Sequence, residues 1–320
     1  MAIKKVAWFG NGRLGLPLLT ALSTSEFDIT VLLRRPRSAY SFLPSSVRTA
    51  SVDFTQHSTL VDTLSGQDAV VVVTQFVPGS DLDRLQLALI DAAIEAGVKL
   101  FIPSEWAPDT VGGNGASGEL IGAMTLPPTP VIAMKRVVHN YLMARASEGK
   151  IAFATIHPGV ILERWIGSIA LDFISRAAEL PDGGYHPFSM TSLQTVCRAL
   201  AGVLSNYPQT RNRFHYIADG VATLDQFVTI LEHKDPSGKT QPWIRKSIDI
   251  VATNAVAIER MKEQPMGVQE FLAGLRVPFF GGLTVWKRLD NRDLGIKDED
   301  RVDVREEMER IAVEAWKRAN

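Results

Sequence analysis

The stretch Val6-Ala7-Trp8-Phe9-Gly10-Asn11-Gly12-Arg13-Leu14-Gly15 opens with a short apolar run and closes with glycines at the spacing G-x-G-x-x-G. Apolar residues then recur at helical spacing over residues 16–22, so the chain is predicted to run strand, tight turn, helix. Gly10 and Gly12 permit a tight turn that brings the backbone close to a pyrophosphate, and Gly15 lets the helix pack against the strand. Because the first N–H groups of a helix bind phosphate, the stretch predicts a dinucleotide site with these candidate residues: Gly10, Asn11, Gly12, Arg13, Leu14 and Gly15.

The same alternation continues through the N-terminal half of the chain. Strands are predicted at residues 29–33, 69–73, 100–102 and 151–156, and helices at 60–64, 82–96 and 131–144, the last with Thr129 as N-cap and Pro130 as its first residue. Strands and helices that alternate at these lengths are typical of βαβ units in a doubly wound parallel sheet. Beyond residue 157 the elements are shorter and less regular. We therefore predict the fold class α/β, with a dinucleotide-binding Rossmann domain at residues 1–157 and a smaller, mixed α/β substrate-binding region at residues 158–320 that ends in a helix.

The composition limits the classes of partner. The chain has 320 residues, of which 46% are hydrophobic and 22% charged, and its net charge of -1 provides no basic field to hold nucleic acid or an anionic membrane. No apolar run reaches the length of a membrane span, and the first strand starts too early to leave room for a signal peptide, so we expect a cytoplasmic protein. The single cysteine, Cys197, has no Cys or His at metal-ligand spacing, and no metal site is expected. The expected partner is a small-molecule substrate. The sequence is also compatible with a homodimer.

The end of the second predicted strand indicates which dinucleotide is bound. An acidic residue there would favour the free 2′-hydroxyl of NAD, but this chain places Arg34, Arg35 and Arg37 there. Guanidinium groups match the geometry of a 2′-phosphate, and Arg13 is a further candidate for contact with that phosphate or with the adenine. The sequence therefore predicts NADPH as the cofactor.

A lysine interrupts the apolar face of the helix predicted at residues 131–144. Residues 131, 134, 135, 138 and 142 share one face of that helix, and Lys135 is the charged residue among them. Burial would lower the pKa of Lys135 and make it a proton donor or base near neutral pH. His139 lies one turn further on, while Glu105 and His157 follow strand ends, where the sites of this architecture collect. Lys135 is thus the candidate catalytic residue.

The segment Leu100-Phe101-Ile102-Pro103-Ser104-Glu105-Trp106 resembles the F-x-P-S-E-F/W motif of the NmrA-like and isoflavone-reductase-like family of atypical short-chain dehydrogenases. The resemblance to this family is close over residues 4–165 and weaker over the rest of the chain. Lys135 stands in the place of that family's catalytic lysine, and Val52-Asp53-Phe54 resembles the strand that borders the adenine. The glycine loop departs from the family, whose loop is commonly G-x-x-G-x-x-G and so one residue longer.

The resemblance implies an extended Rossmann sheet, NADPH, and reduction of a C=C, C=O or C=N bond in a small, often aromatic, secondary metabolite. Val131 stands where the tyrosine of a Tyr-x-x-x-Lys pair would be, which agrees with the family's use of the lysine without the tyrosine. Lys135, directly or through water, would stabilise or protonate the anion that develops on the substrate. Besides the glycine loop, the candidate cofactor-binding residues are Arg34, Arg35, Asp53, Phe54, Thr74, Gln75, Pro103, Ser104, Glu105, Lys135, His157 and Pro158.

Two other functions fit the same sequence. One is a non-enzymatic NmrA-like regulator that senses NADP and binds a protein, and the other is a cyclase that uses the same pocket. Such regulators generally lack the lysine, so Lys135 favours an enzyme. The glycine-rich residues 109–128 and the second half of the chain are expected to shape the substrate pocket, with these candidate contacts: Phe76, Trp106, His139, Trp165, Phe188 and Phe279.

Overall fold

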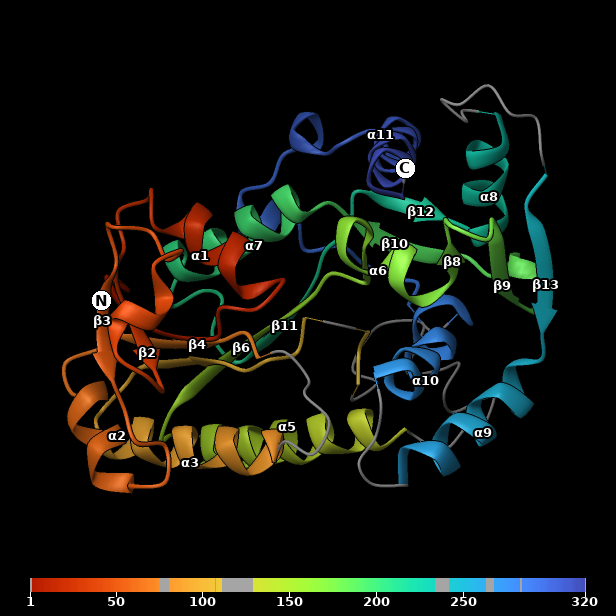
Figure 1. Cartoon of the computed structure of the whole chain (residues 1–320). Coiled ribbons are helices and arrows are strands. Elements are labelled where there is room, and N and C mark those ends of the chain that lie inside the picture. Colours follow the sequence, from red (N-terminus) through yellow and green to blue (C-terminus); the bar gives the residue numbers. More distant parts are fainter. Residues whose placement is uncertain are drawn as a thin grey trace. The chain divides into compact units, whose positions relative to one another are not determined.

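The computed structural model of the chain describes residues 2–74, 81–106, 108–110, 129–233, 242–262, 268–282 and 284–319. The chain forms two compact units that alternate along the sequence (Figure 1). The first unit comprises Met1–Trp106, Ala133–Ile156 and Cys197–His215, and the second comprises Ala107–Ile132, His157–Val196 and Tyr216–Asn320. The assignment of cofactor binding to residues 1–157 and of substrate binding to residues 158–320 stays a prediction.

The first unit is built on a seven-stranded sheet with the order β11-β6-β5-β4-β1-β2-β3. The ladders that join β3, β2, β1, β4, β5 and β6 are all parallel. Helices α1 and α7 lie on one face of the sheet, and α2, α3 and α5 lie on the other (Figure 1), so the predicted doubly wound Rossmann sheet is confirmed. The strands are β1 (Lys5–Phe9), β2 (Asp28–Leu33), β3 (Arg48–Ser51), β4 (Ala69–Val72), β5 (Leu100–Ile102), β6 (Ala152–His157) and β11 (Arg213–Tyr216). The helices are α1 (Gly15–Leu22), α2 (His57–Leu64), α3 (Leu82–Glu95), α5 (Pro130–Ser147) and α7 (Leu193–Ser205), with a 3-10 turn at η1 (Arg37–Tyr40).

Burial on both faces of the sheet explains its continuously apolar central strand. Every residue of β4 is buried, because helices cover the sheet on both sides. On α5, Val138 and Leu142 pack into the same core, as the helical spacing of the apolar residues predicts. The first unit therefore presents its functional side chains from the ends of strands held by a closely packed core.

The sequence pattern missed the two edge strands, β3 and β11. Residues 48–51 read Arg-Thr-Ala-Ser and residues 213–216 read Arg-Phe-His-Tyr, so neither strand carries a continuous apolar run. An edge strand is paired on one side only, and it can form without the apolar pattern that a central strand needs. The segment Val52-Asp53-Phe54, expected as a strand, follows the end of β3, and its first residue continues the ladder through the Val52 N–H, which donates to the Leu33 carbonyl at 2.8 Å.

The start of α5 differs in one respect from the prediction. Pro130 is the first residue of the helix, as predicted, because its fixed φ and missing N–H suit that position. Thr129 is buried, and its hydroxyl makes no hydrogen bond within the described residues. Thr129 therefore stands directly before the helix, but the prediction that its side chain caps the helix is wrong, because its hydroxyl bonds to none of the helix N–H groups.

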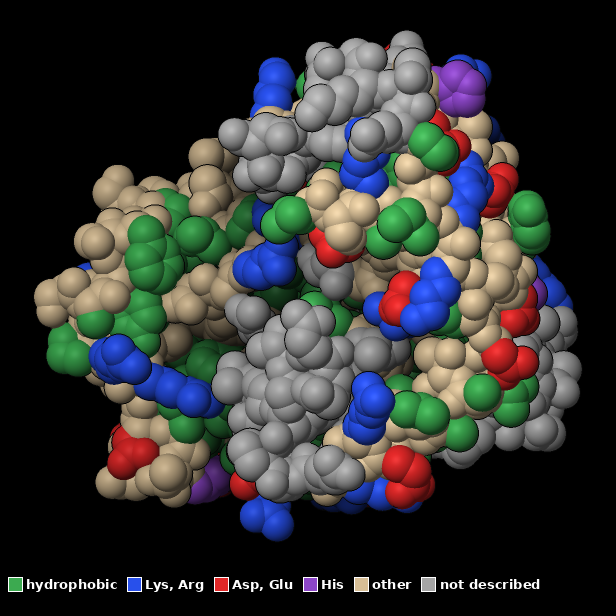
Figure 2. All heavy atoms as spheres, turned by 45° about the vertical axis from the view of Figure 1, so that its right-hand side comes forward, with side chains coloured by type: hydrophobic (Ala, Val, Ile, Leu, Met, Phe, Trp, Pro, Cys, Tyr) green, Lys and Arg blue, Asp and Glu red, His purple; other side chains and the backbone are tan. Residues whose placement is uncertain are grey.

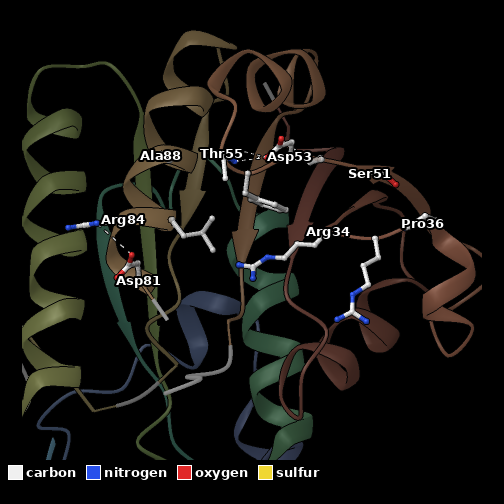
Figure 3. Close-up of a pocket in the computed structure, with 12 residues that line it drawn as sticks. Arg34, Pro36, Ser51, Asp53, Thr55, Asp81, Arg84 and Ala88 are labelled. Carbon is white, nitrogen blue, oxygen red and sulfur yellow. Dashed lines mark hydrogen bonds and ion pairs between the residues drawn. The ribbon is translucent and has the colours of Figure 1, made fainter. Parts of the chain in front are cut away.

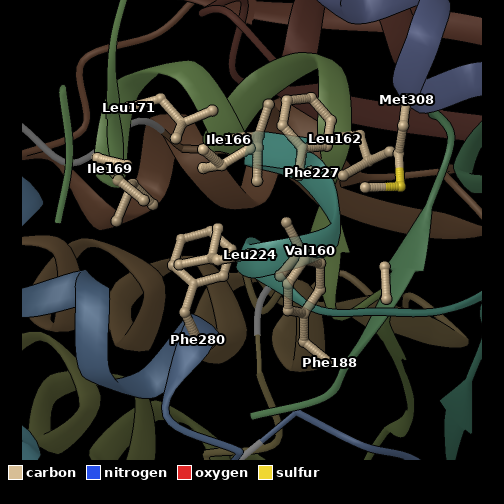
Figure 4. Packing of buried hydrophobic residues seen from close by; sticks show 14 of the residues in the cluster. Val160, Leu162, Ile166, Ile169, Leu171, Phe188, Leu224, Phe227, Phe280 and Met308 are labelled. Carbon is tan, nitrogen blue, oxygen red and sulfur yellow. The ribbon is translucent and has the colours of Figure 1, made fainter. Parts of the chain in front are cut away.

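The second unit contains two small sheets, with the orders β12-β10-β7 and β13-β9-β8. Each sheet holds one parallel and one antiparallel ladder, which confirms the predicted mixed α/β region. Side chains from several of its elements, among them Phe188, Phe227 and Phe280, meet in one apolar core (Figure 4). The strands are β7 (Val160–Ile161), β8 (Leu171–Asp172), β9 (Ala177–Pro181), β10 (Phe188–Thr191), β12 (Gly220–Ala222) and β13 (Ile244–Ile248). The helices are α6 (Leu162–Ile169), α8 (Leu224–His233), α9 (Ile250–Lys262), α10 (Val268–Phe280) and α11 (Val304–Ala319), with 3-10 turns at η2 (Asp182–Gly184), η3 (Arg292–Leu294) and η4 (Asp298–Asp300).

Neither a membrane span nor a metal cluster occurs in the described ranges. No helix there combines the length and the apolar character needed to cross a bilayer. The same ranges hold no group of three or more His, Cys, Asp or Glu side chains placed to bind a metal ion. Cys197 is a partly buried cysteine on α7.

Candidate functional site

The glycine loop between β1 and α1 lies directly against the end of β4. Gly10 has a φ of +121°, and a Cβ placed on it would lie 1.9 Å from the carbonyl oxygen of Val73. A Cβ on Gly15 would lie 2.5 Å from the carbonyl oxygen of Gly10. The indole N–H of Trp8 donates to that same Gly10 carbonyl at 2.5 Å. Only glycine fits at residues 10 and 15, because backbone atoms occupy the space that a side chain would need.

The first turn of α1 is open to an anion. No side chain caps this end of the helix, and its first turn contains no acidic residue that would compete for its N–H groups. The helix dipole and the N–H groups of a first turn favour a phosphate. The loop thus fits the pyrophosphate of a dinucleotide, and Arg13 beside it is exposed.

A pocket of about 970 Å³ opens at the ends of β2 and β3 (Figure 3). Arg34 and Arg35 come from the end of β2, and Asp53 and Phe54 follow β3, so the pocket brings these four predicted residues together. Arg84 enters from α3 and forms an ion pair with Asp81 at 3.6 Å. The residues that line the pocket are Arg34, Arg35, Pro36, Ser51, Val52, Asp53, Phe54, Thr55, Asp81, Arg84, Leu85 and Ala88.

Arg37 does not belong to this pocket, contrary to the prediction. Its guanidinium donates to the backbone carbonyls of Tyr40, Leu43 and Pro44, with 3.1 Å to Leu43 and 3.5 Å to Pro44. These bonds close the turn that follows β2. Arg37 therefore stabilises this loop, because its guanidinium is bonded to three of the loop's backbone carbonyls.

Asp53 is engaged in its own turn. Its carboxylate accepts hydrogen bonds from the Thr55 hydroxyl at 2.7 Å and the Thr55 N–H at 2.9 Å, and from the Gln56 amide at 3.0 Å. The bonds from Thr55 hold the pKa of Asp53 below its usual range. Asp53 is thus an ionised side chain that shapes the turn at the pocket wall.

The segment Pro103-Ser104-Glu105-Trp106, after β5, is bonded to the end of β4. The Ser104 hydroxyl accepts from the Thr74 N–H at 3.1 Å, and the Trp106 indole N–H donates to the Val72 carbonyl at 2.8 Å. The Ser104 N–H donates to the side-chain carbonyl of Gln86 at 2.8 Å. Since Val73 touches the glycine loop and Thr74 follows it, the glycine loop and this segment form one continuous structure.

Lys135 lies against that segment. Its ammonium donates to the backbone carbonyls of Ser104 at 2.5 Å and Glu105 at 2.6 Å. Burial lowers the pKa of Lys135 from its ordinary value, and the Glu105 carboxylate acts in the opposite direction and raises it. Two acceptors occupy two of the three N–H groups of the ammonium. The side chain is therefore held at the strand ends with one donor remaining for another partner.

His139 is buried near Glu105. Its ring is 0% exposed, its Nδ1 lies 3.7 Å from the Glu105 carboxylate, and it stacks on Phe214 at 4.9 Å between ring centroids. That separation from Glu105 exceeds a hydrogen bond. The ring thus packs behind the Lys135 site, and its predicted contact with the substrate stays a prediction.

Several predicted residues have other contacts. His157, the last residue of β6, stacks on Tyr216 of β11 at 5.2 Å, and the Pro158 carbonyl accepts from the Thr191 hydroxyl. Trp165 packs against the apolar core to which Phe188 and Phe279 belong. Gln75, Phe76 and residues 111–128 lie outside the described residues. The roles proposed for all of these stay predictions.

Two residues at the site were missed by the sequence analysis. Trp8 looked like one more apolar residue of a buried strand, and only the fold shows its indole N–H on the Gly10 carbonyl. Gln86 lies on an amphipathic helix, where a polar residue is ordinary, yet it is buried and bonded to Ser104. A polar residue on the inward face of α3 was the signal that could have identified Gln86.

Comparison with known proteins gives consistent results. A family model described as NAD(P)H-binding matches residues 10–147. "Oxidoreductase aprR" from Aspergillus flavus is 30% identical over 266 residues, which cover 82% of this chain and 83% of that protein. The solved structure of AtPrR2 with NADP+ and (+)pinoresinol is similar with a TM-score of 0.73 and 18% identity, covering 97% of this chain and 99% of that one. Leucoanthocyanidin reductase with NADPH from Vitis vinifera is similar with a TM-score of 0.72 and 17% identity, over 97% and 99% of the two chains.

The two solved structures share the fold of this chain from end to end. At 18% and 17% identity they show that fold and nothing finer. The Aspergillus relative is closer in sequence, and its similarity extends over most of both chains. The protein therefore belongs to the NmrA-like and isoflavone-reductase-like family of NAD(P)H-dependent oxidoreductases.

Proposed function

We propose that the protein is an NADPH-dependent reductase that acts on a C=C, C=O or C=N bond of a small, aromatic or secondary-metabolite substrate. The observation that carries this proposal is the placement of Lys135, whose ammonium is bonded to the Ser104 and Glu105 carbonyls at the carboxyl ends of the parallel strands. Ligands of open parallel sheets bind at that edge. A cation held there would supply an acid at the edge of the sheet where the dinucleotide is proposed to bind.

The residues around the glycine loop fit NADPH. Gly10 and the open first turn of α1 would hold the pyrophosphate, and Arg34 and Arg35 would bind the 2′-phosphate. NADPH, when bound, would supply a hydride, which carries both electrons of the reduction. The cofactor roles of Asn11, Leu14 and Thr74 belong to the same proposal.

Lys135 would supply the proton. Its Nζ is fixed by two carbonyls, so its remaining N–H is oriented without further cost in side-chain entropy. A lysine whose pKa is lowered by burial gives up its proton more readily than an exposed one. Lys135 would stabilise the negative charge that develops on the substrate and then protonate it, directly or through a water molecule.

The Arg35→Ala variant tests the cofactor preference. We expect its affinity for NADPH to fall about tenfold or more, because a charge-assisted hydrogen bond to the 2′-phosphate is lost, and its affinity for NADH to stay unchanged. Calorimetric titration with each cofactor gives both values. Arg48→Ala is the matched control, since Arg48 is an exposed arginine of β3 outside the pocket. If Arg35→Ala lowers the affinities for NADPH and NADH equally, Arg35 does not recognise the 2′-phosphate.

The Glu105→Gln variant tests the charge state of Lys135. The Glu105 carboxylate raises the pKa of Lys135, so its removal lowers that pKa further. If protonated Lys135 is the acid, the rate of reduction falls as pH rises through this pKa. We therefore expect the alkaline limb of the kcat/KM profile to move to lower pH, by roughly one unit. Glu95→Gln, at an exposed position of α3, is the control of equal charge change. If the alkaline limb of the profile does not move, or moves to higher pH, the proposal that protonated Lys135 is the acid is contradicted.

The function itself is tested by a substrate screen. NADPH consumption is followed with aromatic ketones, enones, imines and the lignan (+)pinoresinol, which is bound in the structure of AtPrR2. Reduced product from one of these classes supports the reductase. Tight NADPH binding with no turnover in any class favours the regulator that senses NADP, and cyclised product without oxidation of NADPH favours the cyclase.

A further inference from the structure

Arg34 is held by two aromatic rings. Its guanidinium carbon lies 5.7 Å from the centroid of the Phe9 ring and 5.5 Å from that of the Phe54 ring. The two rings are themselves 4.6 Å apart and inclined at 44°. A guanidinium within about 6 Å of an aromatic face is attracted by the negative face of the ring. Arg34 thus has two such partners at once.

The two rings come from separate elements that meet at the pocket. Phe9 is the last residue of β1 and directly precedes Gly10, whereas Phe54 follows β3. Phe9 is 8% exposed and belongs to the core of the first unit, and Phe54 packs against that core. In Figure 3 the Arg34 side chain extends from the end of β2 into the pocket. The rings are fixed by the core, so they provide a rigid support for a side chain that is otherwise flexible.

No carboxylate among the described residues neutralises Arg34. The carboxylate of Asp53, in the wall of the same pocket, accepts hydrogen bonds from Thr55 and Gln56. Asp81 pairs with Arg84. The aromatic rings hold the cation in place without cancelling its charge, which an aspartate in the same position would do. The full charge of Arg34 therefore remains for an anion.

We infer that Phe9 and Phe54 are positioning residues for cofactor selectivity, which hold the Arg34 guanidinium ready for the 2′-phosphate of NADP(H). This inference rests on the proposed function, in which Arg34 and Arg35 bind that phosphate. A long side chain that is already ordered loses less entropy when it binds its ligand. The aromatic pair would therefore strengthen the binding of the phosphorylated cofactor more than the binding of NAD(H), which lacks the 2′-phosphate.

The variants Phe9→Leu and Phe54→Leu test this inference. Each keeps an apolar side chain of similar size and removes the aromatic face. We expect each to lower the ratio of the NADP+ and NAD+ affinities by about three- to tenfold, as expected for loss of one cation–π partner. The same fall is expected in the ratio for 2′,5′-ADP over 5′-AMP, which carry only the adenosine part. Phe27→Leu is the matched control, because Phe27 is also 8% exposed but lies outside the pocket.

A double-mutant cycle separates positioning from packing. If Phe9 acts through Arg34, then Phe9→Leu has no further effect on the affinity ratio once Arg34→Met is present. Because Phe54 is partly exposed, Phe54→Leu supplies the test should Phe9→Leu fail to fold.

Each outcome of the titrations has one meaning. An unchanged ratio, or a loss that persists in the Arg34→Met background, overturns the inference. A wild-type protein that binds NADP+ no more tightly than NAD+ overturns the proposed cofactor preference instead. Calorimetry with the four nucleotides on the full chain distinguishes these results.

Discussion

The Lys135→Met variant is expected to lose reductase turnover by about a hundredfold or more while it still binds NADPH. Methionine fills nearly the same volume on the apolar face of α5, so the helix keeps its packing. What disappears is the ammonium that is bonded to the Ser104 and Glu105 carbonyls and poised to donate a proton. Steady-state rates of NADPH consumption measure kcat, and quenching of intrinsic fluorescence measures NADPH binding.

The stability of this variant is expected to change little. Two carbonyls lose their donor, which is unfavourable, but the cost of burying a charge is also removed. Lys150→Met makes the same substitution at an exposed lysine that pairs with Glu148, and it controls for the loss of one positive charge. If Lys135→Met turns over substrate as fast as the wild type, Lys135 has no part in the mechanism. If the variant loses NADPH binding instead, the main role of Lys135 is to bind the cofactor.

The sequence could identify the parts of the site that depend on local patterns. Gly10 and Gly15 were recognisable because a tight turn between a strand and a helix requires glycine, and the structure finds backbone atoms where their side chains would be. Lys135 was recognisable because a charge on an apolar helix face is costly unless it has a partner. Both signals lie within one or two elements, where spacing along the chain determines position in space.

Contacts between distant segments could not be predicted in this way. Arg37 looked equivalent to Arg34 and Arg35 in the sequence, and only the folded turn shows its guanidinium on the loop carbonyls. Phe9 looked like the end of a buried strand, and its position beside Phe54 depends on the pairing of β1, β2 and β3. The second unit is built from strands as short as two residues, too short for a period to be recognised.

Gly10→Ala is expected to destabilise the protein by roughly 3 kcal/mol or more and to abolish tight NADPH binding. Two costs add at this position. Alanine must adopt a φ of +121°, and its Cβ would lie 1.9 Å from the Val73 carbonyl oxygen. That neighbour is backbone in a buried strand end, so it cannot turn aside as a side chain would. The loop or β4 must shift, and the phosphate-binding N–H groups move with the loop.

Gly66→Ala isolates the first of these costs, the strain of a positive φ. Gly66 also has a positive φ, +76°, but a Cβ there would meet nothing within 4 Å, so this variant carries only the backbone strain of about 1 kcal/mol. Urea denaturation gives both free energies of unfolding, and the difference between the two variants measures the contact with Val73 together with the greater strain of a φ of +121° over one of +76°. If Gly10→Ala were as stable as Gly66→Ala and bound NADPH as tightly as the wild type, the close approach of the loop to β4 would not be the reason that glycine is needed at residue 10. A third outcome is that Gly10→Ala binds NADPH weakly but unfolds at the same urea concentration as Gly66→Ala. In that case only the loop shifts, and the contact with Val73 matters for phosphate binding more than for stability.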